Sequence, residues 1–130
     1  MNSYETYLKM NYILQIEDAM EIYNGMLETL SLCKVEGKAD IVHELVRSSC
    51  YYTEVRMSWE FKTNAEKVAD DPNRTLAHNA VIRNVDIVAR MINNAGIETP
   101  WRDKLGNDRK RIGDFGCFIG WITAINNRLG

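Results

Sequence analysis

The chain has 130 residues, of which 45% are hydrophobic and 26% charged, and its formal net charge is −2. This size suits one domain with a core of its own, and the composition excludes a disordered or fibrous protein. The slight negative charge argues against nucleic-acid binding as the main activity. We therefore expect a single domain over residues 1–130.

The beginning of the sequence lacks the basic start and apolar block of a signal peptide. The longest uncharged apolar run, residues 115–125, is about half the length that a bilayer crossing needs. Cys33, Cys50 and Cys117 have no C-x-x-C spacing, so we expect reduced thiols rather than disulfides or a zinc site. These features predict a cytoplasmic protein that does not bind a membrane, and we expect no metal and no cofactor.

The first predicted helix covers residues 3–32. Its apolar residues recur at steps of three and four, with glutamates on the opposite side. Ser3 is a candidate N-cap, and Gly25 in the helix interior predicts close packing against a neighbour.

A second helix is predicted over residues 39–69, where apolar and small side chains form one seam from Ile41 to Trp59. We place its end at Asp70-Asp71-Pro72-Asn73, because these residues combine helix caps with a proline that disfavours helical geometry in the residue before it.

The third predicted helix covers residues 74–95. Ala77, Val81, Val85 and Ile92 belong to its buried face, and Gly96 followed by Ile97 predicts a Schellman-type end. Residues 98–109, with a Gly106-Asn107 turn signal, are expected to form an irregular loop.

The last helix is predicted over residues 110–128. Gly113, Gly116, Gly120 and Ala124 form a row of small residues along it, which allows another helix backbone to approach closely. This helix should therefore lie centrally. Together the four segments predict an all-α fold, a compact bundle of about four helices.

Two polar clusters are candidates for binding. At the start of the third predicted helix, Arg74, His78 and Asn79 lie near free amides that attract a small anion. At the start of the last helix, Arg111 and Asp114 belong to a basic run that opposes the helix dipole. The alternatives are that His78 is a hydrogen-bonded structural residue and that Asp108 simply caps the last helix while the basic run pairs with the acidic first helix.

These two clusters also carry a resemblance. Arg74-x-x-x-His78-Asn79-Ala80-x-Ile82 together with Arg109-x-Arg111-Ile112-Gly113-Asp114-Phe115 resembles a family of small bacterial helical proteins of unknown function. The resemblance covers about residues 70–118 and implies an all-α fold. It implies no activity, cofactor or catalytic residue.

Two functions from different classes remain open. The sequence lacks metalloprotease, P-loop, α/β-hydrolase and di-iron motifs and has a surplus of aromatic and methionine side chains. This favours a non-enzymatic protein-interaction or regulatory module that binds a protein partner or self-associates as a homodimer. The alternative is a small enzyme or an anion- or nucleotide-binding protein whose pocket combines the residues of both clusters, namely Arg74, His78, Asn79, Arg111 and Asp114.

Overall fold

The computed structural model describes residues 12–129, and the side chains of residues 12–125. The described chain contains five helices and no strand, which confirms the all-α fold class. The helices are α2 (Ile16–Leu32), α3 (Lys38–Trp59), α4 (Asn64–Asn94), α5 (Pro100–Asp103) and α6 (Arg109–Leu129).

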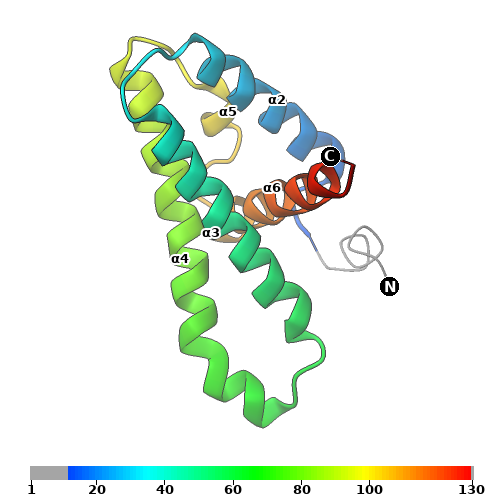
Figure 1. Cartoon of the computed structure of the whole chain (residues 1–130). Helices are drawn as coiled ribbons and strands as arrows, with labels where there is room; N and C mark the ends of the chain where they lie inside the picture. The colour runs from blue at the N-terminus through cyan, green and yellow to red at the C-terminus, as the bar shows by residue number, and fades with distance from the viewer. Residues whose placement is uncertain (1–11, 130) are drawn as a thin grey trace.

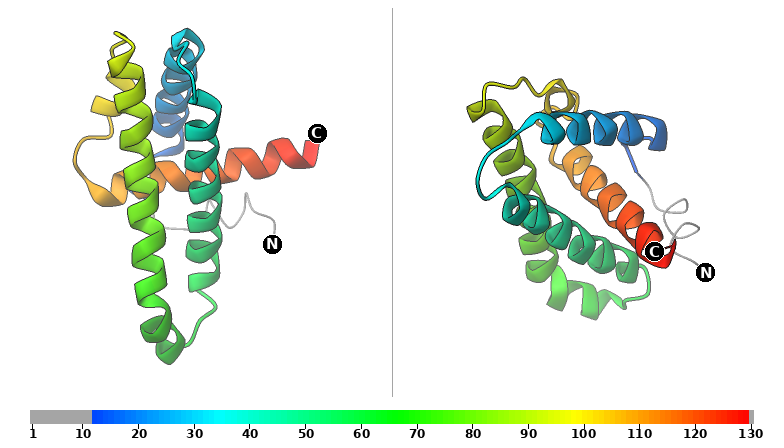
Figure 2. Two further views of the ribbon diagram at one scale, coloured as in Figure 1. Left: turned by 60° about the vertical axis from the view of Figure 1, so that its left-hand side comes forward. Right: turned by 45° about the horizontal axis from the view of Figure 1, so that its top comes forward.

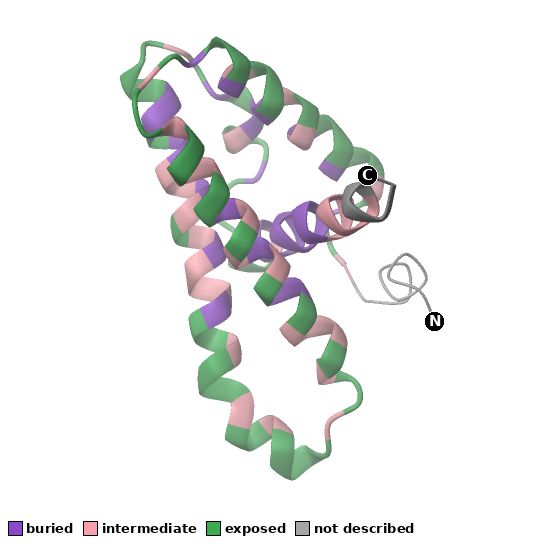
Figure 3. Cartoon of the chain, viewed as in Figure 1, coloured by how far each residue is buried: buried purple, intermediate pink, exposed green. Residues whose placement is uncertain are grey.

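The long helices α3 and α4 form an antiparallel hairpin, and α6 crosses this hairpin near its middle (Figures 1 and 2). All residues from Ile112 to Gly120 are buried, so α6 is the central helix, as predicted (Figure 3). The predicted close approach is also confirmed. A Cβ atom on Gly116 would lie 2.5 Å from a Val81 methyl group of α4, and a Cβ on Gly113 would lie 2.7 Å from the His78 ring.

Helices α2 and α5 pack together beside α6. The short helix α5 begins at Pro100 and buries Trp101, whose indole nitrogen donates a 2.8 Å hydrogen bond to the Thr29 hydroxyl. A Cβ atom on Gly25 would lie 3.1 Å from the Cβ of Trp101, so the glycine in α2 makes room for this side chain. The prediction of an irregular loop over residues 98–109 therefore missed one short helix.

The first helix starts later than predicted. Helix α2 begins at Ile16, with Gln15 in extended geometry before it, so a continuous helix over residues 3–32 is wrong for residues 12–15. The backbone amides of Ile13 and Leu14 donate to the side chain of Asp114 on α6, which replaces the bonds of a helical turn. The proposed N-cap at Ser3 lies outside the described residues.

The turn of the hairpin lies at residues 60–63, and the predicted break at residues 70–73 is wrong. Helix α4 begins at Asn64 with a capping box in which Thr63 and Glu66 bond each other's backbone amides, at 3.1 and 3.0 Å. Pro72 lies inside α4. The predicted boundaries 39–69 and 74–95 therefore become 38–59 and 64–94.

Side-chain contacts hold the helical segment around Pro72. Lys62 forms a 2.7 Å ion pair with Asp70, and the Tyr51 hydroxyl and the Asn73 side chain are 3.0–3.1 Å apart. Pro72 has no backbone N–H, so the carbonyl of Val68, four residues earlier, loses its helical partner. Because Pro72 and Val68 are exposed, this carbonyl can bond water instead.

The end of α4 agrees with the prediction. Gly96 has a left-handed φ of 85°, the Ile97 amide bonds the Ile92 carbonyl at 3.3 Å, and the Gly96 amide bonds the Asn93 carbonyl at 2.9 Å. These two bonds define a Schellman motif.

Beyond the level at which α6 crosses, the hairpin consists of α3 and α4 alone and projects away from the other helices (Figures 1 and 3). We call this part, residues 57–76, the hairpin tip. None of its residues is buried. The hydrophobic core lies at the other end, where α2, α5 and α6 meet the hairpin.

Candidate functional site

Asp114 on α6 contacts two other parts of the chain, helix α3 and the segment before α2. Its side chain is fully buried, and one oxygen lies 2.6 Å from the guanidinium of Arg56 on α3. The other oxygen accepts hydrogen bonds from the amides of Ile13 and Leu14, at 2.7 and 3.1 Å. The guanidinium of Arg56 also lies 4.7 Å from the centre of the Tyr12 ring. Both carboxylate oxygens therefore have internal partners, and this aspartate does not face a solvent-reachable pocket.

His78 has a different set of partners. Its Nε2 lies 2.8 Å from the backbone carbonyl of Arg109, and its ring stacks on Tyr52 with centroids 5.1 Å apart. A carbonyl can only accept, so Nε2 carries the proton and donates. Burial lowers the pKa of His78, and the nearby Arg109 charge lowers it further, although the bond to the carbonyl opposes this shift. These contacts agree with the interpretation of His78 as a hydrogen-bonded structural residue.

The other three predicted ligand-binding residues also have separate partners. The Arg74 guanidinium binds Asp71 at 2.8 Å and lies over the Trp59 ring. Arg111 donates to the backbone carbonyl of Lys104 at 3.1 Å. The Asn79 side chain accepts from Arg109, whose carbonyl binds His78. The structure thus brings Asn79 and His78 together around Arg109 and gives Arg74, Arg111 and Asp114 other partners.

Asp108 caps the last helix, as the alternative interpretation of the basic run predicted. Its carboxylate accepts from the amides of Lys110 and Arg111, at 2.9 and 3.3 Å. The basic run was also expected to pair with the acidic first helix, but two of its residues do not. Arg109 and Arg111 instead bind Asn79 and the Lys104 carbonyl.

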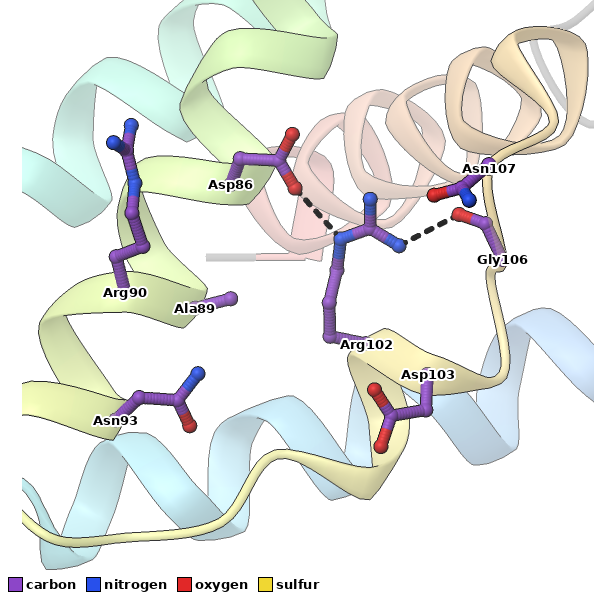
Figure 4. Close-up of a pocket in the computed structure, with 8 residues that line it drawn as sticks. All are labelled: Asp86, Ala89, Arg90, Asn93, Arg102, Asp103, Gly106 and Asn107. Atoms are coloured by element: carbon purple, nitrogen blue, oxygen red, sulfur yellow. Dashed lines mark hydrogen bonds and ion pairs between the residues drawn. The ribbon is translucent and has the colours of Figure 1, made fainter.

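A polar groove of about 720 Å³ lies between α4, α5 and the turn after α5 (Figure 4). Arg102 is held in it by Asp86, 2.7 Å from its Nε, and by the Gly106 carbonyl, 2.8 Å from Nη1. Arg90 has no hydrogen bond or ion pair to any residue that the structure describes. The groove is lined by Asp86, Ala89, Arg90, Asn93, Arg102, Asp103, Gly106 and Asn107.

A second, more apolar groove of about 540 Å³ separates α2 from α3. Leu27 is 44% exposed at its edge, and Lys38 bonds the Leu30 carbonyl at 2.9 Å. The remaining lining residues are Ser31, Ala39, Val42, His43 and Val46.

The outermost side of α4 carries a row of exposed apolar residues along the hairpin tip. Residues three, four and seven positions apart share one side of a helix. This row, which we call the outer face of α4, consists of Ala65, Val68, Ala69, Pro72 and Leu76, all exposed. Val68 is 77% and Leu76 69% exposed, and Phe61 at the hairpin turn reaches 80%. The opposite side of the same helix is buried from Ala77 onward.

Sequence reasoning missed both Arg56 and the outer face of α4. Arg56 lies 58 positions from Asp114, and no local pattern connects them. The outer face was hidden by the wrong break at Pro72, which divided its residues between two predicted helices. The capping box Thr63-x-x-Glu66 was the signal that could have revealed the true helix start.

Comparison of the chain with protein-family models, with curated proteins and with solved structures finds no match in any of the three. The resemblance to small bacterial helical proteins therefore stays a prediction. Within the described part of the chain, none of the helices has both the length and the apolar content that a membrane crossing requires. The described residues also contain no group of three or more His, Cys, Asp and Glu side chains placed to hold a metal ion.

Proposed function

We propose that this protein is a non-enzymatic protein-interaction module and that it binds its partner through the outer face of α4. One observation carries this proposal: the hairpin tip contains no buried residue, yet it presents Val68 and Leu76 at 77% and 69% exposure on one side of a helix. Apolar side chains grouped on a projecting surface are typical of contact sites for other proteins.

The polar clusters support a catalytic function less well. Asp114 and Arg56 are bound to each other, and His78 donates to a backbone carbonyl. A general acid or base needs a proton-accepting or proton-donating atom within reach of the substrate. Asp114 has no exposed oxygen, and His78 uses its Nε2 for the Arg109 carbonyl, whereas no described element covers the apolar groups on α4.

Site-specific photo-crosslinking tests the proposed surface. A photoreactive amino acid at Val68 or Leu76, introduced in cells that produce the protein, should give a discrete covalent adduct. The matched control places the same group at Glu28, which is exposed on α2. Adducts that are absent from positions 68 and 76, or equally strong at position 28, would contradict the proposal.

A second candidate function is binding of a small anion in the polar groove. Arg102 is positioned there by two bonds to the protein and is only 17% exposed, while Arg90 lacks a partner among the described residues. The groove thus contains Arg102, which is paired with Asp86, and Arg90, which has no partner among the described residues, and a guanidinium can bind a phosphate or carboxylate group. This candidate takes the anionic ligand of the sequence prediction and moves it from the His78 cluster to a position further along the same side of α4, because Asn79, Asp86 and Asn93 are seven positions apart.

A further inference from the structure

The outer face of α4 has opposite charges at its two ends. Glu66 lies beside Ala65 at the start of the face, and it uses one carboxylate oxygen for the Thr63 amide. Arg83 lies seven positions after Leu76, in line with the face, and is exposed. Arg83 has no hydrogen bond or ion pair to any described residue. The apolar row is thus bounded by an acidic group at one end and an unpaired cation at the other.

Such a surface is complementary to itself when two copies run in opposite directions. With a two-fold axis at the level of residues 74 and 75, Arg83 of each copy comes level with Glu66 of the other. Leu76 and Pro72 then lie beside the axis, and Val68 and Ala69 face the level of Ala80. A two-fold arrangement makes both charge contacts at once, because the same patch is used on each copy.

We propose that the partner of the outer face is a second copy of this chain, bound with its α4 antiparallel. This inference rests on the proposed function, since it names the occupant of that same surface. The contact extends over residues 66–83, a length of about 27 Å at the rise of an α-helix. Because only one helix from each copy takes part, the interface is smaller than the standard size of stable complexes, and the dimer dissociates at low concentration.

Sedimentation equilibrium of the purified full chain from about 1 to about 200 μM should show a concentration-dependent shift from monomer to dimer. The substitution Leu76→Lys should remove the dimer. The matched control is Leu32→Lys at the end of α2, where the side chain is 61% exposed, and it should leave association unchanged. Circular dichroism of each variant checks that the helices are retained.

Charge reversal tests the antiparallel arrangement. In the single variants Arg83→Glu and Glu66→Lys, like charges meet twice per dimer, and each should associate roughly tenfold more weakly than the parent protein. An equimolar mixture of the two variants should associate as well as the parent, because opposite charges again meet at both contacts. The variant Glu66→Gln, which keeps a capping-box residue, controls for the helix start.

The dimer proposal is wrong if the parent chain stays monomeric at the highest concentration. It is also wrong if the equimolar mixture of Arg83→Glu and Glu66→Lys associates no better than either variant alone. The proposed function is tested separately from the dimer. If photo-crosslinking at Val68 joins a different protein and the purified chain is monomeric, the interaction module stands and the self-association is wrong.

Discussion

Arg56 and Asp114 lie 2.6 Å apart in the interior, and this ion pair joins α3 to α6 while the same aspartate holds the backbone before α2. We predict that Asp114→Asn lowers the free energy of unfolding by about 3–5 kcal/mol, because it leaves Arg56 charged and unpaired. Urea denaturation at neutral pH measures this loss. The control Asp103→Asn removes an exposed carboxylate and should change stability by no more than about 0.5 kcal/mol. A loss below about 1 kcal/mol in Asp114→Asn would show that the pair contributes little.

Gly120 lies at a close contact between α6 and α3. A Cβ atom there would overlap the Thr53 hydroxyl and lie 3.1 Å from the Ser49 carbonyl. We expect Gly120→Leu to destabilise the fold by about 1–3 kcal/mol or more, because the helices must separate. Gly120→Ala should cost less, and Thr53→Ala should recover part of that cost. A double-mutant cycle by thermal denaturation gives the coupling, and strictly additive effects would contradict the proposed overlap.

His78 should make stability depend on pH. Its pKa in the folded protein is lowered, by burial first and by nearby arginines, whereas the unfolded chain titrates near the usual value of about 6.5. The unfolded state therefore binds the proton more readily, and stability is lost as pH falls below about 6.5 toward the folded pKa. His78→Gln, which keeps a side-chain donor, should flatten this dependence in urea titrations between pH 7.5 and pH 5. Equal slopes in both proteins would refute the assignment.

The polar groove gives a prediction for the second candidate function. If a small anion binds there, phosphate at fixed ionic strength should raise the melting temperature of the parent protein, since it binds only the folded state. Arg90→Ala should abolish this increase. Arg83→Ala removes the same charge from a position outside the groove and should leave the increase intact. An unchanged melting temperature in the parent protein would rule out phosphate as the ligand.

Local patterns predicted those features whose physical cause is itself local. The small-residue row of α6 forms a close contact because spacing alone places glycines on one side of a helix, and Gly96 with Ile97 encodes the end of α4 within six residues. Pro72 misled the prediction, because its local preference for a break was outweighed by the capping box at Thr63 and by contacts along the hairpin. The position of Asp114 could not be predicted, since its partners lie 58 to 101 residues away in sequence.

The hairpin tip should unfold locally more easily than the rest of the protein. Its helices contact each other but bury no residue, so little apolar surface opposes their separation. Amide protons of residues 57–76 should exchange with solvent by a local opening that leaves residues 112–120 protected. A partner bound to α4 would oppose that opening and slow amide exchange in the hairpin tip. Slowed exchange would therefore detect binding even when the complex is too weak to isolate.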